Sequence, residues 1–480
     1  MPKKEPTTET TETTETTESP NDGEYVLSPE EEARYGRFSK NQKRLFMTIM
    51  AIATSLGPYS SSAYMPATQM IADEFNTTGS TINLSGTVFN VMTAMSPCLF
   101  NRLYEFYGCR PIFIFMATLL LIPSILTAVS VNLPMFFVFR SLTGLFSYSF
   151  INMAASITGH IYKPTQRSTA LSCCLAGTLA ASAFAPVLAG VIITYASWRI
   201  IFWVQTGITA LVLVMAIVFL KETTPETEFS IWKRQTSKKF KLIAVNPFKV
   251  VFALRIPTLF LSGITTLLLS FNYFALLTPI RYVVDPRFGF TSPIQGSLFY
   301  LAPGCGMVIS TQFAGRYADW VLKRAIKRRH GRLVSEDRLQ ACLPAMLLMF
   351  SSIIIYGWSI QEKKGGLVLP IVMMFLNGLS QTFVYTPINS YCIGSLPEIG
   401  SPIALGSNYF IRNIGAAIGS GVTLPLFDAI GIGWSSVING ILIVVAFGST
   451  MLCYKLGQSL RTKWLKKNGY RSLDGDDREG

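Results

Sequence analysis

Apolar stretches long enough to cross a lipid bilayer recur along this chain, and they constrain its fold more than any other feature. A helix of about 20 apolar residues crosses the roughly 30 Å of hydrocarbon in a bilayer. Lipid offers no hydrogen-bond partners to the backbone, so each stretch is expected to be a helix. The stretches lie at 45–66, 80–100, 112–131, 135–159, 168–195, 200–220, 257–280, 295–314, 340–360, 367–388, 403–427 and 434–456. The sequence therefore predicts an all-α membrane protein with twelve transmembrane helices.

The charged residues exclude several other classes of protein. Of the 480 residues, 50% are hydrophobic and only 14% are charged, and the net charge is +14. The positive residues lie between the apolar stretches and in the two tails, so they do not form a nucleic-acid-binding face. The eight cysteines lack metal-ligand spacing, and no nucleophile-base pair or phosphate-binding loop accompanies the two histidines. We therefore expect no catalytic residue, no metal and no cofactor, and the chain is not predicted to be an enzyme.

Lysine and arginine gather in every second gap between the apolar stretches. Short loops with this bias lie on the cytoplasmic side of a membrane. The two richest gaps are at 221–256 and 316–338, and the chain after 456 adds further basic residues. Exceptions in the alternate gaps are Arg199, Arg281, Arg287, Lys363 and Lys364. The pattern predicts that both termini are cytoplasmic, and the expected location is the plasma membrane.

The longest internal polar stretch divides the apolar stretches six and six. We predict a disordered cytoplasmic tail at 1–44, because its Thr-Glu repeat is too polar to bury a core. A six-helix bundle at 45–220, a cytoplasmic loop at 221–256, a second bundle at 257–456 and a cytoplasmic tail at 457–480 follow. The segments 101–105 and 315–319 are similar and occupy the same place in each half. The two bundles are therefore expected to be pseudo-symmetric.

Motifs at matching places resemble the major facilitator superfamily. The segment 101–110 reads Asn-Arg-Leu-Tyr-Glu-Phe-Tyr-Gly-Cys-Arg, similar to the family's loop signature Gly-x-Leu-x-Asp-Arg-x-Gly-Arg-Arg. Arg140 and Gly144 are similar to the Arg-x-x-x-Gly of its fourth span. The resemblance implies two parallel halves that alternate access to a central site. It also implies that Glu105, Arg110 and Asp319 act in gating at the cytoplasmic face.

The fifth stretch carries small residues at a helical spacing. Ala181, Ala185, Pro186 and Gly190 resemble an antiporter motif, Gly-x-x-x-Gly-Pro-x-x-Gly-Gly, with alanine in most glycine positions. Small residues four apart let helices approach closely, and a proline can bend a helix. We predict a gating interface here, with static helix packing as the alternative. Together with the Trp-Arg pair at 198–199, this resembles the fungal twelve-span drug:proton antiporters, which implies protons as the coupled ion.

Two arginines within the apolar stretches are candidate binding residues. Arg412 lies about nine residues into its stretch, near the bilayer midplane at 1.5 Å per residue. A charge at this depth costs several kcal/mol unless it faces a wet cavity or a partner. Arg140 lies closer to the end of its stretch, so snorkelling to the membrane surface is an alternative to a binding role. No acidic residue lies near the middle of any stretch, which favours an anionic or neutral amphiphilic solute.

Polar and aromatic side chains within the stretches are the other candidates for the wall of a central site. For each of them, packing or helix–helix hydrogen bonding is the alternative. Beside the two arginines, the candidates are Tyr64, Asn152, Tyr273, Gln381, Tyr385 and Asn408.

The sequence thus predicts a monomeric secondary transporter that binds a small molecule in the lipid bilayer. We expect it to export an organic anion or an amphiphilic drug-like compound in exchange for protons. Nutrient uptake or facilitated diffusion is the alternative within the same fold, and the direction of solute flux separates the two. A transport-inactive receptor or scaffold is the alternative from another class. The Thr-Glu repeat at 7–18 lacks apolar anchors for a partner, which argues against it.

Overall fold

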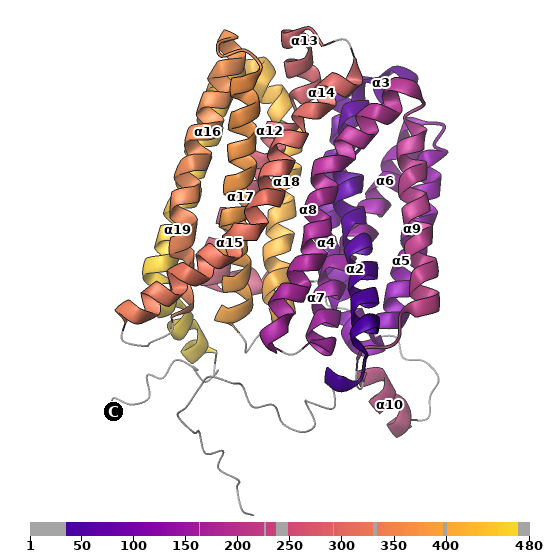
Figure 1. Ribbon diagram of the computed structural model, residues 1–480, viewed down its shortest axis with the longest axis vertical. Coiled ribbons are helices and arrows are strands. Elements are labelled where there is room, and N and C mark those ends of the chain that lie inside the picture. The colour runs from indigo at the N-terminus through magenta and orange to yellow at the C-terminus, as the bar shows by residue number, and fades with distance from the viewer. Residues whose placement is uncertain are drawn as a thin grey trace, which may run out of the picture.

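The apolar stretches form long helices that run side by side (Figure 1). The computed structural model describes residues 35–162, 164–224, 227–236, 248–290, 292–329, 334–396 and 401–468. Most of the predicted tails, and parts of the central loop, lie outside these residues. Throughout the described part of the chain, every regular element is helical.

The first half of the chain forms one group of helices. Its elements are α2 (Lys40–Ser62), η1 (Met65–Ala67), α3 (Thr68–Glu74), α4 (Gly79–Tyr107), α5 (Cys109–Ala128), α6 (Leu133–Ser147), α7 (Ser149–Ile161), α8 (Pro164–Tyr195) and α9 (Arg199–Phe219). Within this group α2 packs on α8, α4 on α6, and α5 on α9. We call it the N-terminal half.

Short helices lead from the first group to the second. They are α10 (Glu228–Thr236), α11 (Phe248–Phe252) and η2 (Ala253–Arg255). The C-terminal half then comprises α12 (Pro257–Leu277), η3 (Ile280–Val284), α13 (Asp285–Phe288), α14 (Pro293–Phe299), α15 (Leu301–Arg328), η4 (Ser335–Ala341), α16 (Cys342–Glu362), α17 (Val368–Ser395), α18 (Ser401–Ile430) and α19 (Ile432–Lys467). Here α15 packs on α17, α12 on α18, and α16 on α19.

Helices occupy all of the predicted apolar stretches. Among the described residues, eight helical segments are long and apolar enough to cross a membrane. They lie in α5, α8, α9, α12 with its extension, α16, α17, α18 and α19. The remaining stretches fall on α2, α4, the α6–α7 pair and α15. The all-α membrane fold is confirmed, while the count of twelve spans stays a prediction.

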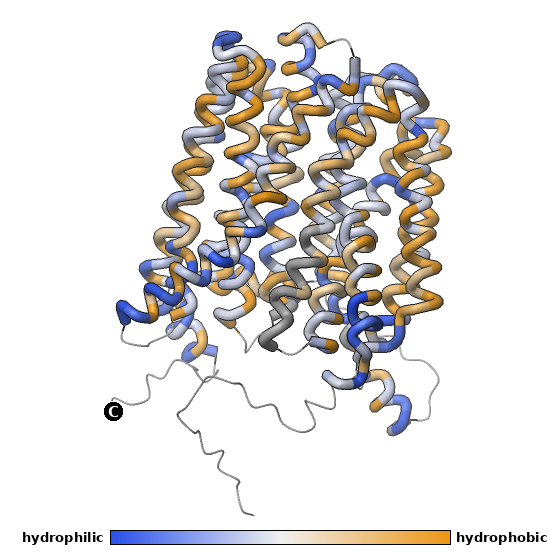
Figure 2. The backbone as a smooth tube through the Cα atoms, viewed as in Figure 1, coloured by the Kyte–Doolittle hydropathy of each residue, from blue (hydrophilic) through white to orange (hydrophobic). Residues whose placement is uncertain are grey.

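The outward faces of the long helices are apolar. Figure 2 shows hydrophobic residues along the outer helices, and hydrophilic residues at α10 and at the lower end of α15. Large apolar side chains that are exposed on these helices include Phe115, Val138, Leu188, Val214, Phe313, Leu347 and Val444. A water-soluble surface rarely exposes so much contiguous apolar area, whereas the hydrocarbon of a bilayer accommodates it.

Basic residues end several helices at one end of the molecule. Basic residues end α10, α15 and α19 at the end where the described chain finishes, which we call the basic end (Figure 1). The opposite end carries α3, α13 and α14, and we call it the α13 end. These names describe position in the molecule only.

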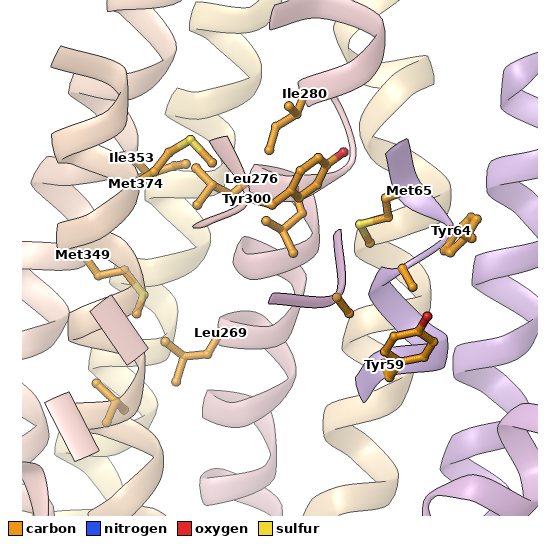
Figure 3. Close-up of a cluster of buried hydrophobic side chains, with 14 of the residues drawn as sticks. Tyr59, Tyr64, Met65, Leu269, Leu276, Ile280, Tyr300, Met349, Ile353 and Met374 are labelled. Atoms are coloured by element: carbon orange, nitrogen blue, oxygen red, sulfur yellow. The ribbon is translucent and has the colours of Figure 1, made fainter. Parts of the chain in front are cut away.

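The halves meet along two lines of contact, α4 against α18, and α8 against α14 and α15. One buried hydrophobic cluster belongs to the N-terminal half alone and includes Phe46, Phe113 and Phe150. A larger cluster joins residues of both halves, among them Tyr59 and Tyr64 from the first, and Leu276 and Tyr300 from the second (Figure 3). Its N-terminal members come from the segments nearest the α13 end. One region of apolar contact between the halves therefore lies at the α13 end.

Candidate functional site

A cavity of about 110 Å³ lies between the two halves. The N-terminal half contributes Pro58 and Ser61 from α2 and Thr178 from α8, and the C-terminal half contributes side chains from α12, α15, α17 and α18. Of these helices, α8, α15 and α18 pack directly against the other half. A ligand in this cavity would touch both halves, so any movement of one half against the other would change its surroundings. We call this space the central cavity.

Arg412 of α18 lines the central cavity and is held by aromatic rings. Its guanidinium carbon lies 4.9 Å from the ring centre of Tyr385 and 4.7 Å from that of Tyr409. Cation–π attraction acts within about 6 Å and contributes ~0.5–2 kcal/mol. Tyr148, at the junction of α6 and α7, is a third tyrosine whose side chain interacts with Arg412. The three tyrosines thus hold the cation on the wall of the central cavity.

Polar contacts hold Tyr385 in place beside Arg412. Its hydroxyl lies 2.6 Å from the hydroxyl of Ser270, and it accepts a hydrogen bond of 3.1 Å from the amide of Gln381. The same amide of Gln381 donates to the carbonyl oxygen of Leu269 at 3.3 Å. Tyr385 is therefore tied to α12 as well as to its own helix, which fixes the ring under the cation.

The central cavity has a polar part and an apolar part. Ser270, Gln381, Tyr385 and Arg412 lie in one region, whereas Phe274 and other apolar side chains lie closer to the α13 end. At 1.5 Å per residue, the last lining residue of α12, Leu277, lies about 10 Å along the helix from Ser270. No aspartate or glutamate is among the lining residues, all of which the structure describes.

Of the sequence-predicted residues, Arg412, Tyr273, Gln381 and Tyr385 all line the central cavity. Arg140 and Tyr64 meet elsewhere, inside the N-terminal half. Arg140 is only 1% exposed, so its side chain is buried and does not snorkel to a surface. Its guanidinium carbon lies 3.7 Å from the ring centre of Tyr64, and Phe89, Phe136 and Phe202 complete an aromatic box.

Arg140 makes few polar contacts for a buried cation. Its Nη2 donates to the carbonyl oxygen of Ser60 at 3.3 Å, while its Nε and Nη1 find no hydrogen-bond partner within the described residues. One helical turn along α6, Gly144 lets α4 approach, because a Cβ there would lie 2.7 Å from the carbonyl oxygen of Phe89. The Arg-x-x-x-Gly pattern thus places the buried Arg140 one turn from the point where α6 and α4 approach each other closely.

Asn152 and Asn408 lie away from the lining of the central cavity. The amide of Asn152 donates to Asn101 Oδ1 at 3.2 Å, which joins α7 to α4. The amide of Asn408 donates to the sulfur of Cys392 at 3.6 Å, which joins α18 to α17. In this structure both residues serve helix–helix contacts, the alternative considered for each from the sequence.

The loop signature lies at the basic end, where a carboxylate holds the start of α5. Glu222, just after α9, accepts hydrogen bonds from the backbone N–H groups of Cys109 and Arg110, both at 3.1 Å. A negative charge at a helix N-terminus is stabilising by ~0.3–1 kcal/mol. Arg110 also donates through its guanidinium to the carbonyl oxygen of Ile217 at 3.1 Å. The side chain of Glu105 lies outside what the structure describes, and Asp319 is exposed on α15.

The small residues of α8 divide between two faces of the helix. A Cβ at Gly190 would collide with the side chain of Ser297 in α14, and a Cβ at Gly304 in α15 would collide with Ala183 of α8. Gly190 and Ala183 therefore meet the C-terminal half. A Cβ at Gly177 would lie 2.8 Å from the carbonyl oxygen of Ala51 in α2.

Successive residues of an α-helix are about 100° apart around the axis, so Ala181 and Ala185 lie on the same side of α8 as Gly177. That side packs on α2, within the N-terminal half. Pro186 is buried within the same helix. Among the predicted gating residues in α8, Gly190 thus has a close contact across the halves.

Sequence reasoning did not select Tyr409 and Ser270. Tyr409 stands three residues before Arg412 in the same helix, and residues at that spacing share a face. This spacing was a usable signal for the second ring on the guanidinium. Ser270 carries no comparable signal, because its role depends on α12 meeting α17, which only the fold shows.

Known proteins resemble this chain over most of its length. Among curated proteins it is 26% identical to Dityrosine transporter 1 of Saccharomyces cerevisiae, across 85% of this chain and 79% of that protein. It is 24% identical to the efflux pump radE of Floropilus chiversii, across 90% of this chain and 84% of the pump.

Solved structures share the fold at low sequence identity. The human organic anion transporter MFSD10 has a TM-score of 0.61 at 15% identity, covering 85% of this chain and 99% of that one. A bacterial homologue of the human lysosomal transporter Spinster has a TM-score of 0.65 at 12% identity, covering 88% and 99%. The family model described as Major Facilitator Superfamily matches residues 50–420. With this match over most of its length, the chain belongs to the major facilitator superfamily.

Proposed function

We propose that this protein is a secondary transporter that exports a small organic anion with an apolar body, in exchange for protons. The observation that carries the proposal is the position of Arg412, the cation on the wall of a central cavity whose described lining has no carboxylate. A charge in a low-dielectric interior is costly unless it is paired. A negatively charged group on the solute would supply the missing charge.

The geometry around Arg412 favours a carboxylate or a similar flat anion. Because Arg412 lines the central cavity, a solute there would contact its N–H groups. Two parallel N–H groups match the two oxygens of a carboxylate, which gives a bidentate contact that lysine cannot reproduce. This supports an organic acid as the substrate class.

The rest of the central cavity suits an apolar body. Phe274, Leu277 and Met307 line it together with Met65, and the tyrosine hydroxyls and Ser61 add scattered polar groups. Ligand sites of this composition bury an apolar body and fix its orientation with few polar contacts. The solute would lie with its anionic group at Arg412 and its apolar part towards the α13 end.

The relatives support export and an anionic substrate without deciding either. One is named an efflux pump, one a dityrosine transporter and one an organic anion transporter. A cavity that both halves line supports alternating access. Proton coupling is part of the proposal because the motif in α8 resembles that of proton antiporters.

Transport by purified protein in liposomes tests this proposal. We expect a labelled aromatic monocarboxylate to accumulate against its gradient only when a pH gradient is imposed, and its neutral alcohol analogue to be transported much more slowly. Equal rates for the two solutes would contradict the anion site. Movement of the acid without any response to the pH gradient would instead favour facilitated diffusion.

We further propose that the protein lies in the plasma membrane with both termini and the basic end in the cytoplasm. In a variant without reactive native cysteines, Arg328→Cys at the end of α15 should resist a membrane-impermeant thiol reagent added to intact cells. Lys364→Cys, an exposed position between α16 and α17, should react. The reverse labelling pattern would overturn the orientation. Labelling of both positions after the cells are opened is the control for reactivity.

A further inference from the structure

A buried carboxylate lies at the α13 end, on the C-terminal side of the boundary between the halves. Asp285, the first residue of α13, is only 3% exposed. Its Oδ2 accepts a bond of 2.7 Å from Arg281, one turn earlier. Its Oδ1 has no hydrogen-bond partner among the described residues. Such a carboxylate is half satisfied, so gaining a proton removes a buried charge as well as breaking an ion pair.

A second unpartnered polar group lies close enough to interact with Asp285. The hydroxyl of Tyr300 is buried, and within the described residues it has no hydrogen-bond partner. Its electrostatic neighbours are Asp285, Arg281, Tyr282 and Tyr64. Figure 3 shows Tyr300 with Ile280 and Leu276 on one side and Met65 on the other. No hydrogen bond joins this hydroxyl to the Asp285 carboxylate among the described residues, so the two groups interact only electrostatically in this structure.

The groups around Asp285 also hold the two halves together. Tyr282, next to Arg281, donates from its hydroxyl to the carbonyl oxygen of Gly79 in α4 at 3.0 Å. Gly296 leaves room for the Asp285 carboxylate, and the next residue, Ser297, meets Gly190 of α8. Contacts on both sides of Asp285 therefore cross the boundary.

The backbone at this point is unusual. Arg281 and Tyr282 lie in η3, a π-helical segment between α12 and α13. Segments of π-helix are rare and occur often at functional sites, because their wider turn is easily rearranged. The Arg281–Asp285 pair joins the start of this segment to the residue that follows it. Loss of the pair would therefore act directly on the backbone that carries Tyr282.

The other charged or titratable neighbour on the same element is Arg287. Its guanidinium donates to the carbonyl oxygens of Ile360 and Gln361, at 3.0 and 3.1 Å, and is thereby directed to the end of α16. The groups that face Asp285 or its neighbour Tyr300 are thus Arg281 and Tyr282 from η3, Tyr300 from the α14–α15 junction and Tyr64 from the N-terminal half.

We propose that Asp285 is a proton-binding site that controls opening of the α13 end. As a carboxylate it holds Arg281, keeps η3 in shape and directs Tyr282 to Gly79, so the halves stay together. When it binds a proton, the pair with Arg281 weakens, η3 loses this support, and the contact of Tyr282 across the halves is released. The inference rests on the proposed function only in taking the proton as the coupled ion.

Distance measurement between spin labels tests the proposal without requiring transport. Met70→Cys on α3 and Val368→Cys at the start of α17 are exposed, uncharged positions in different halves at the α13 end. In nanodiscs, and in a background without native cysteines, we expect the longer-distance population to grow as pH falls. Asp285→Asn should raise the ratio of long to short distances roughly fivefold or more at neutral pH and remove its pH response.

Three further variants decide between outcomes. Asp285→Glu should keep the pH response, and Asp428→Asn, an exposed carboxylate of α18, should behave as the parent. Arg281→Gln should shift the response to higher pH, because the carboxylate loses the guanidinium that favours its charged form; this variant keeps the test open if Asp285→Asn does not fold. An unchanged pH response in Asp285→Asn or in Arg281→Gln would overturn the proposal.

Transport separates this inference from the proposed function. In liposomes, Asp285→Asn should reduce the solute accumulation driven by a pH gradient by at least about tenfold. It should keep solute counterflow, because counterflow needs no net proton movement. If the parent protein shows no response to a pH gradient, the antiport proposal fails. The distance measurement still tests whether Asp285 controls opening of the α13 end. If the parent is coupled and Asp285→Asn is equally coupled, the proton site lies elsewhere.

Discussion

Replacing Arg412 with alanine should abolish transport of anionic solutes while sparing whatever transport of matched neutral solutes the parent shows. The guanidinium lies on the wall of the central cavity between the rings of Tyr385 and Tyr409. Removing one partner of a desolvated, hydrogen-bonded charge pair costs about 2–5 kcal/mol, or roughly 30-fold or more in affinity. The loss of transport should be confined to the anionic solutes, because only they need the positive charge.

Arg412→Lys separates charge from shape. Lysine keeps the positive charge but lacks the planar fork, and it stacks less well between two rings. We expect the affinity of Arg412→Lys for carboxylates to lie between the affinities of the parent and of Arg412→Ala. The measurement is binding and transport for paired carboxylic acids and alcohols at equal protein abundance, with Arg328→Ala at the exposed end of α15 as the control. Equal losses for acids and alcohols would show that Arg412 has a structural role.

The helices and the depth of Arg412 were predictable from the sequence because both depend on the linear spacing of apolar residues. A residue about nine positions into a bilayer-length helix lies near its middle, whatever the fold around it. Its aromatic neighbours on α17 and α18 also belong to apolar stretches. The cavity wall was therefore partly predictable from residue type and depth.

Asp285 was not predictable in this way. The seventh apolar stretch was expected to end at residue 280, whereas the helical chain continues through η3 and α13 to Phe288. A boundary drawn from hydropathy stops where charged residues begin, and here Arg281 and Asp285 form an ion pair one turn apart. Local pairing let the helical segment continue past the apolar stretch.

The role of each face of α8 also needed the structure. Small residues at Ala181, Ala185 and Gly190 indicate close helix approach but not which helix approaches. The fold places α2 on one side of α8, and α14 and α15 on the other. Since α2 belongs to the same half, bulk at Ala185 acts on packing within that half, whereas bulk at Gly190 acts between the halves.

Gly190→Val should therefore stop transport while leaving each half folded. A Cβ at Gly190 already collides with Ser297 of α14, so the larger side chain must push the halves apart at the α13 end. Overpacking of this kind costs about 1–3 kcal/mol, which shifts the population of the closed state roughly 5- to 150-fold. We expect the distance between labels at Met70→Cys and Val368→Cys to lengthen and the rate of transport to fall accordingly.

A second substitution tests whether the collision with Ser297 is the cause. Ser297→Gly removes the side chain that Gly190→Val meets, so the double variant should regain a large part of the lost transport and of the short distance. Ala185→Leu serves as the matched comparison, because it adds bulk on the opposite face of α8. It should lower the thermal stability of the protein without lengthening the distance. Full loss of transport in the double variant, or lengthening by Ala185→Leu alone, would contradict this assignment of the two faces.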